Sequence, residues 1–167
     1  MTAPHETSSE PGVASRARAR LAALGLTLHG PHPPHTPLLA VVVHNGVAHV
    51  SGQLPRIDGK ITCLGRLGES VSLEQGVEAA GVCALNALAV VEAALGDLDR
   101  IEQFLKVTGF VASSPDFAQQ PKVIDGASRI FHDVFGEAGR HARSAIGVAA
   151  LPHGAAVEIE LSVAVAR

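Results

Sequence analysis

The C-terminal stretch of the chain, residues 140–167, alternates in polarity with a period of two, and this pattern constrains the fold more than any other. Every second residue from Val157 to Val165 is Val, Ile or Leu, and the positions between them are Glu, Ser or Ala. Successive side chains of a strand point to opposite faces. We therefore expect a strand with one aliphatic face, which needs a second layer to cover it, and one face of small and acidic side chains.

The residues just before this strand predict a partner for it. A segment that begins at Arg143 also alternates, and Leu151–Gly154 contains a Pro and a Gly, which interrupt strand pairing. A hairpin with its turn centred in that segment sets Arg143 opposite Ser162. In that register Arg143, Glu158 and Glu160 share one face, whose other members are mainly Ala and Gly. We expect such a face to leave a cavity with charge at its edge.

Two interpretations of Arg143 and Glu158 are open from spacing alone. They form a salt bridge on a solvated surface, which contributes only about 0–1 kcal/mol, or they belong to a ligand site. The small neighbours and the second carboxylate of Glu160 favour a site. A guanidinium also suits a carboxylate ligand, because it can donate two parallel hydrogen bonds.

Two motifs resemble those of one protein family. The run from Arg143-Ser144 to Leu151-Pro152, followed by Val157–Glu160, is similar to the C-terminal signature of the RidA/YjgF family. Ser51–Pro55 reads Ser-Gly-Gln-Leu-Pro and resembles the Ser-Gly-Gln-x-Pro segment of the same family. The resemblance extends from about Pro37 to Ala166, with the motifs in the family's order.

The resemblance implies a fold and an activity. The fold would be α+β, a mixed sheet with two helices packed on one face, as in chorismate mutase-like and RidA-type proteins. The assembly would be a homotrimer with ligand pockets between subunits. Many members of the family are enamine or imine deaminases, which hydrolyse 2-imino acids to 2-keto acids without a metal or other cofactor. Older descriptions call the family L-PSP endoribonucleases.

The resemblance also implies roles for individual residues. Arg143 matches the arginine that grips the substrate carboxylate, and Glu158 matches the glutamate that positions or activates the hydrolytic water. Ser51 and Gly52 match residues that line the pocket. Two positions depart from the family pattern. Leu38 stands where the family frequently has a tyrosine, and Ala145 stands where it frequently has a cysteine.

Composition restricts the class of partner. The chain has 167 residues, enough for one domain with a core. Hydrophobic residues make up 47% and charged residues 17%, which favours burial of part of the surface in an oligomer. The net charge is −3, and Trp and Tyr are absent, so neither a basic field for phosphates nor many stacking platforms for bases exist. We expect no nucleic-acid partner.

The N-terminal region predicts a separate segment. Residues 1–36 read as a polar arm with a short helix over Ala14–Leu24 and a Pro/His connector, and residues 37–167 as the RidA-like domain. The connector holds His29, His32 and His35, but no carboxylate or cysteine is near to complete a metal site. A Pro-rich spacer is therefore the favoured interpretation.

The sequence also predicts the cellular compartment of the protein. The first residues lack the basic start and apolar run of a signal peptide, and no run of about 18 apolar residues predicts a membrane span. The two cysteines, Cys63 and Cys83, have no paired spacing and read as reduced thiols. We expect a cytoplasmic protein with no membrane partner.

The remaining patterns give the order of elements. Asn45-Gly46 between two β-rich runs predicts a hairpin. Ser72–Leu95 predicts a long helix with a capping box and a Gly stop, Ile101–Ala112 a strand, and about Phe117–Phe135 a second helix. We expect both helices on the aliphatic face of the C-terminal strand, and neighbouring subunits on the other face.

Two alternative functions use the same features. A non-catalytic sensor could hold a small carboxylate in the same cleft, which the departures at Leu38 and Ala145 favour. An endoribonuclease is disfavoured by the acidic net charge and the few aromatic residues.

Overall fold

In the computed structural model, which describes residues 15–31 and 37–166, a five-stranded sheet is covered on one face by two helices. The sheet has the order β1-β2-β7-β5-β6, and a separate two-stranded ribbon joins β3 to β4. In chain order the helices and strands are α1 (Arg16–Ala23), β1 (Val41–His44), β2 (Val47–Gln53), β3 (Arg56–Ile57), β4 (Lys60–Ile61), α2 (Leu73–Leu95), β5 (Ile101–Ala112), α3 (Gln120–Phe135), β6 (Ala142–Val148) and β7 (Val157–Val165). Three short 3₁₀ turns, Leu98–Arg100, Gly136–Gly139 and Pro152–Gly154, connect them.

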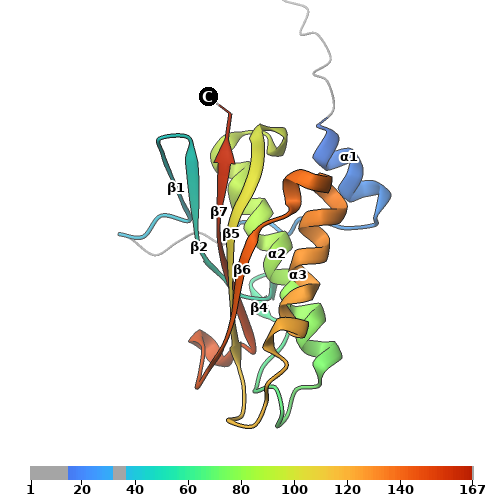
Figure 1. The fold of residues 1–167 in the computed structure, drawn as a ribbon, viewed down its shortest axis with the longest axis vertical. Coiled ribbons are helices and arrows are strands. Elements are labelled where there is room, and N and C mark those ends of the chain that lie inside the picture. The colour runs from blue at the N-terminus through green and yellow to red at the C-terminus, as the bar shows by residue number, and fades with distance from the viewer. Residues whose placement is uncertain (1–14, 32–36, 167) are drawn as a thin grey trace, which may run out of the picture.

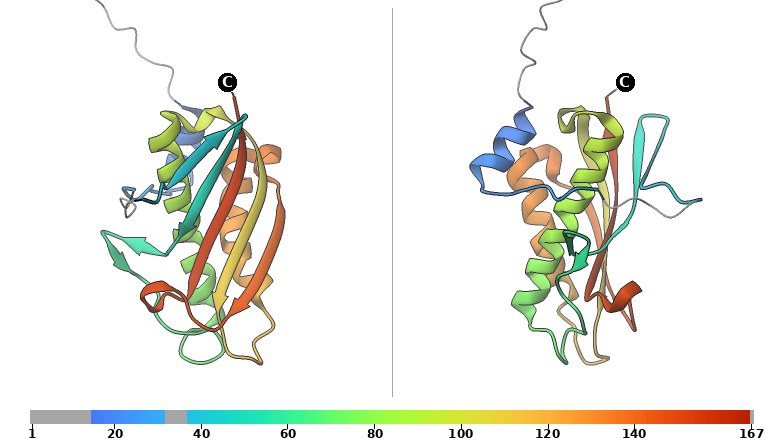
Figure 2. Two further views of the ribbon diagram at one scale, coloured as in Figure 1. Left: turned by 90° about the vertical axis from the view of Figure 1, so that its left-hand side faces the viewer. Right: turned by 180° about the vertical axis from the view of Figure 1, so that it is seen from behind.

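The layers confirm the predicted α+β fold with a mixed sheet and two helices on one face. Helices α2 and α3 lie side by side behind the sheet, while the other face of the sheet is uncovered (Figure 1 and Figure 2). The alternate Val, Ile and Leu residues of β7 are buried against these helices, whereas Glu158, Glu160 and Ser162 lie on the uncovered face. The period-of-two pattern of the last strand therefore predicted which face would be covered.

The first hairpin forms where the Asn-Gly dipeptide predicts it. Asn45 and Gly46 both have positive φ, 49° and 76°, and join β1 to β2 in an antiparallel pair. Two consecutive positive φ angles match the twist of the flanking strands, which is why this dipeptide favours a two-residue turn. The apolar run Leu38–His44 predicts a strand over its whole length, but β1 begins three residues later, at Val41.

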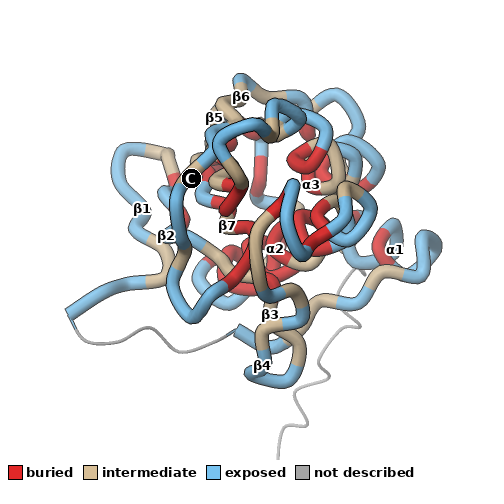
Figure 3. The backbone as a smooth tube through the Cα atoms, turned by 90° about the horizontal axis from the view of Figure 1, so that it is seen from below, coloured by how far each residue is buried: buried red, intermediate tan, exposed pale blue. Residues whose placement is uncertain are grey.

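Helix α2 supplies most of the core. Ser72 and Gln75 form the predicted capping box, each side chain accepting a hydrogen bond from the other's backbone N–H, at 3.2 and 2.9 Å. Gly96 ends the helix with φ 82°. By length and composition α2 would suffice to cross a membrane, but 67% of its apolar window is buried between the sheet and α3, as the core helix of a globular fold is (Figure 3).

The predicted hairpin between the last two strands is wrong. Strand β5 lies between β6 and β7, pairing in parallel with β6 and antiparallel with β7. In this arrangement Arg143 is level with Val107 of β5, and it does not pair with Ser162. A parallel pair requires a crossover, and α3 provides it between β5 and β6. The Leu151–Gly154 segment thus crosses the end of β5 and does not close a hairpin.

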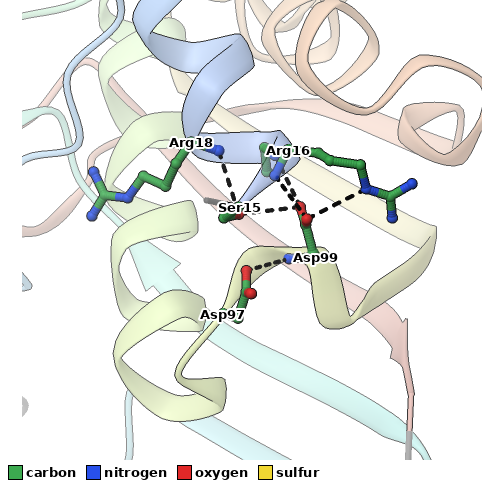
Figure 4. A network of polar contacts seen from close by, with 6 residues as sticks. Ser15, Arg16, Arg18, Asp97 and Asp99 are labelled. Atoms are coloured by element: carbon green, nitrogen blue, oxygen red, sulfur yellow. Dashed lines mark hydrogen bonds and ion pairs between the residues drawn. The ribbon is translucent and has the colours of Figure 1, made fainter. Parts of the chain in front are cut away.

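The short helix α1 forms within the predicted range and docks on the rest of the protein through Asp99. The Asp99 carboxylate accepts hydrogen bonds from the backbone N–H groups of Arg16 (2.7 Å) and Ala17 (2.9 Å) and from the Ser15 hydroxyl (3.1 Å) (Figure 4). Ala17 and Leu21 are buried beneath the helix. A residue distant in sequence therefore satisfies the free N–H groups at the helix start. Residues 1–14 and 32–36, which include His32 and His35, lie outside the described residues.

Candidate functional site

The Ser51-Gly52 motif lies at an irregularity of the sheet. The pairing of β2 with β7 shifts register between Val50 and Gln53, so Ser51 and Gly52 form a bulge. Ser51 donates from its backbone N–H to the carbonyl of Ala40 (2.9 Å) and from its hydroxyl to the carbonyl of Leu39 (2.7 Å). These bonds hold the segment before β1 against the end of β2. Bulges of this kind re-aim side chains and are frequent beside active sites.

Glu158 lies directly against Gly52. A Cβ atom on Gly52 would overlap Oε1 of Glu158, so only glycine leaves room for the carboxylate at this place. Burial raises the pKa of the Glu158 carboxyl, and the neighbouring Glu160 carboxylate raises it further. A half-buried carboxylate with a raised pKa is a stronger base than an exposed one, as a general base requires.

A cavity of about 390 Å³ opens beside this pair. Its wall comes from the bulge, from the segment before β1, from the β3–β4 ribbon and from the turn before β7. The lining residues are His29, Gly30, Pro31, Leu38, Leu39, Ala40, Ser51, Gly52, Gln53, Leu54, Arg56, Asp58, Gly59, Asn86 and His153. Three of the predicted site residues, Leu38, Ser51 and Gly52, therefore contribute to one cavity.

Asn86 is a wall residue that the sequence did not single out. Its Nδ2 donates to the carbonyls of Leu54 (2.9 Å) and Arg56 (3.0 Å), which fixes the chain after the bulge to helix α2. Because both donors are used, the amide orientation is set, and the buried Oδ1 has no donor among the described residues. The available signal was one asparagine within residues 79–91 of the helix, which are otherwise apolar.

Arg143 lies elsewhere, which corrects the predicted shared face with Glu158. Its Nη1 donates to Oδ1 of Asp125 (2.8 Å) and to Oγ of Ser128 (3.0 Å), both on α3. Arg143 thus faces the helices, whereas Glu158 lies on the uncovered face. Ala145, two residues on, faces the same side as Arg143 and packs against the core. The prediction failed because it assumed that β6 and β7 pair.

The sequence and the fold were compared with known proteins. The model of the family described as "YjgF/chorismate mutase-like, putative endoribonuclease" matches residues 19–162. The chain belongs to this family.

Relatives of this YjgF protein cover nearly its whole length. Protein TCP17 of Trypanosoma cruzi is 46% identical over 87% of this chain and 91% of that protein. The crystal structure of Atu1372 from Agrobacterium tumefaciens, a protein of unknown function, is 44% identical over 89% of this chain and 91% of that one, with a TM-score of 0.82. A structure from Shewanella oneidensis named a putative endoribonuclease is 30% identical over 89% of this chain and 99% of that one, with a TM-score of 0.86.

In this YjgF protein a single protomer gathers some of the predicted site residues and separates others. Leu38, Ser51, Gly52 and Glu158 meet at one end of the uncovered face, and Arg143 and Ala145 lie on the helix face of an edge strand. Within residues 15–31 and 37–166, no three His, Cys, Asp or Glu side chains group as metal ligands would. What one protomer offers here is the Glu158 carboxylate beside Gly52, hydrogen-bonding groups of the cavity wall, and Arg56 as the cationic side chain among the residues that line the cavity.

Proposed function

We propose that this protein hydrolyses reactive enamine and imine intermediates to 2-keto acids and ammonia, at clefts between subunits of a cytoplasmic homotrimer. The observation that carries the proposal is the Glu158 carboxylate, half-buried with a raised pKa against Gly52, which lines the cavity. This is the group that a water-activating role needs, in a site large enough for a small acid.

The substrate carboxylate also needs a cation. In Glu158's own protomer Arg56 lines the cavity but donates to Gly59, and Lys106 lies on the uncovered face but donates to Ser144. Arg143 of a neighbouring subunit is the candidate, because β1 and β6 are the two edge strands of the sheet and can meet another copy. Exposed apolar side chains flank both edges: Leu38 (64% exposed), Leu39 (62%), Val42 (46%), Val43 (49%) and Ile146 (45%). Apolar exposure at the edges supports a subunit contact there.

Arg143 has the geometry to take a carboxylate. Among the described residues, the side chain of Arg143 makes its hydrogen bonds through Nη1, to Asp125 and Ser128. The Nε–Nη2 edge is therefore free to donate two parallel hydrogen bonds to a ligand. Holding the acid in this way places its C=N carbon at a fixed position, which lowers the entropic part of the barrier.

The reaction then needs only water and Glu158. The carboxylate takes a proton from water as the oxygen attacks the imine carbon, and Glu158 returns this proton to the nitrogen, which completes a neutral carbinolamine. Glu158 then takes the hydroxyl proton of the carbinolamine and passes it to the nitrogen as the C–N bond breaks, so that ammonia leaves and the C=O bond of the 2-keto acid forms. No electrons are exchanged with another molecule, so the step balances without a cofactor.

A second candidate function is a non-catalytic sensor for small carboxylic acids. Leu38 lines the cavity where a tyrosine is frequent in RidA proteins, and this removes a hydroxyl that a reaction could use. Ribonuclease activity is a weaker candidate, because a net charge of −3 gives little attraction for phosphates. RNA cleavage by highly purified protein that disappears in Glu158→Gln would favour it.

The test generates imines in solution with an amino-acid oxidase and follows keto-acid release with and without the protein. Wild type should accelerate release. Arg143→Ala should abolish both 2-keto-acid binding and hydrolysis, and Arg143→Lys should rescue little, since an ammonium lacks the fork geometry. Glu158→Gln should keep binding but lose turnover.

Glu160→Gln is the matched control, because it removes the same charge two residues along the same face of β7. It should retain hydrolysis, with the pH profile moved to lower pH, because the like charge that helps to raise the pKa of Glu158 is gone. A wild type that binds 2-keto acids through Arg143 but accelerates no imine would establish the sensor function. Equal activity in all variants would leave Arg143 and Glu158 with no part in catalysis.

A further inference from the structure

A chain of hydrogen bonds extends from Arg143 across helix α3 to the turn before β6. Arg143 Nη1 donates to Ser128 Oγ (3.0 Å), Ser128 Oγ lies 3.0 Å from His141 Nε2, and His141 Nδ1 lies 2.7 Å from the carbonyl oxygen of Gly139. The Phe131 ring meets the His141 ring edge-on at 5.8 Å between centroids. All these groups are at least partly buried, so their positions are constrained by packing.

The direction of each bond follows from chemistry. The carbonyl of Gly139 can only accept, so Nδ1 of His141 carries the proton. In the neutral ring Nε2 is then an acceptor, and the Ser128 hydroxyl donates to it. The lone pairs of Ser128 Oγ consequently point toward Arg143, which has only donors. Each hydrogen bond in this series therefore has only one possible donor and one possible acceptor.

The surroundings of His141 favour its neutral form. Burial lowers its pKa, the hydrogen bond to Gly139 opposes this, and the charge of Arg143 lowers the pKa further. The charged and titratable groups around it are Arg143 on β6, Asp125 and His132 on α3, and Arg140 in the turn, which pairs with Glu137. The neutral ring is the form that the donor order of the chain requires.

We propose that Ser128 and His141 are positioning residues that, together with the charge partner Asp125, hold the Arg143 guanidinium by Nη1 and keep its Nε–Nη2 edge turned to a substrate carboxylate. This inference rests on the function proposed above and adds the residues that pre-organise its binding group. The guanidinium borders a depression of about 300 Å³ that Ser128, Gly139 and His141 also line. A long side chain fixed in advance loses less conformational freedom on binding.

The test measures the affinity of pyruvate, a 2-keto acid, by calorimetry on the full-length protein. Ser128→Ala should weaken binding about tenfold, because one hydrogen bond to a charged group is lost. His141→Phe keeps a ring against Phe131 but removes both nitrogens, and should weaken binding about threefold through Ser128. Serine and neutral histidine carry no charge, so neither substitution changes the net charge around Arg143. A loss of affinity therefore reports on the orientation of the guanidinium.

Three further measurements separate positioning from general damage. Ser114→Ala removes a half-buried hydroxyl from the loop after β5, distant from Arg143, and should leave affinity unchanged. In imine hydrolysis, Ser128→Ala should raise KM with little change in kcat, as expected when ground-state binding is lost. Nitrogen NMR should show the neutral Nδ1–H tautomer of His141.

The outcomes distinguish this inference from the proposed function. Suppose that wild type and Ser128→Ala bind pyruvate with affinities within twofold of each other, or that His141 carries its proton on Nε2. Either result overturns the positioning role of Ser128 and His141 and leaves the proposed deaminase activity untouched. If the variants weaken pyruvate binding but wild type hydrolyses no imine, the positioning role is supported and the proposed deaminase activity is overturned. A wild type without affinity for pyruvate overturns both.

Discussion

The surroundings of the Glu158 carboxylate affect both its strength as a base and the stability of the fold. Its carboxylate is half-buried beside Gly52, and Glu160 adds a like charge, so the charged form is disfavoured in the folded protein. The same environment that makes the group a stronger base therefore reduces the stability of the fold at neutral pH. Function and stability oppose each other at this one side chain.

This opposition predicts a stability change for Glu158→Gln. Because the folded-state pKa is raised, stability from this group is full below its ordinary pKa and is lost as pH rises through the raised value. Removal of the charge should raise the melting temperature at pH 7 relative to wild type, and the difference should vanish near pH 4. Imine hydrolysis at pH 7 should fall by about 10²–10⁴-fold. Calorimetric melts across pH check the first part, and an unchanged melting temperature at pH 7 contradicts it.

The steric role of Gly52 gives a second prediction. In Gly52→Ala the new methyl group must displace the Glu158 carboxylate, which is the end of a flexible side chain and can move. The protein should fold, but hydrolysis should drop by about tenfold or more, because the base is misplaced. Gly30→Ala is the control, since a Cβ there meets open space in the wall of the same cavity. Equal activity of the two variants contradicts the assigned place of Glu158.

At the scale of elements, helix α1 depends on a contact far away in sequence. The Asp99 carboxylate binds the N–H groups that begin α1, and Arg18 pairs with Glu92 of α2. Burial raises the pKa of Asp99, but the hydrogen bonds from Ala17, Arg16 and Ser15 outweigh it, so the net shift is downward. Stability from this contact is therefore present above the ordinary pKa of an aspartate and lost as pH falls through the lowered value.

Asp99→Ala should release this helix. We expect a loss of about 1–2 kcal/mol in the free energy of unfolding, the range for removal of a helix cap. Hydrogen exchange should increase at the amides of Arg16 and Ala17, and the difference from wild type should shrink in acid. Asp116→Ala, an exposed aspartate in the loop before α3, is the control. Unchanged exchange in Asp99→Ala contradicts the docking role.

Local patterns predicted the elements well and the pairing of the last strands poorly. The capping box of Ser72, the Asn45-Gly46 turn and the 12-residue strand β5 are set by neighbouring residues, so the sequence shows them directly. The position of β6 depends on β5 competing for β7, which no local pattern records. The error moved Arg143 to the wrong face, and hid its contacts with Asp125 and Ser128.

At the scale of the whole molecule, one protomer does not bring the two residues of the proposed site together. Glu158 lies on the uncovered face and Arg143 on the helix face of an edge strand, so they cannot contact one small substrate within one chain. Several copies arranged with closed symmetry can bring one protomer's edge to the next protomer's cavity. The site we propose is therefore a property of the assembly.

The assembly itself is testable. A homotrimer of a 17.1 kDa chain has a mass of 3 × 17.1, or about 51 kDa. Light scattering at micromolar concentration should give this value for wild type and for Glu158→Gln. A monomer under these conditions removes the composite site.

Activity of mixed trimers tests the composite site most directly. Arg143→Ala and Glu158→Gln chains, each inactive alone, are co-expressed in equal amounts with different tags. In a ring where each site takes Glu158 from one chain and Arg143 from the next, every mixed trimer holds one intact site, so random assembly should restore about one quarter of wild-type activity. Wild type mixed with the double variant should also give about one quarter, against about one half for a site within one chain. Mixed trimers of the two single variants, shown by mass spectrometry to contain both chains yet without activity, would contradict the account.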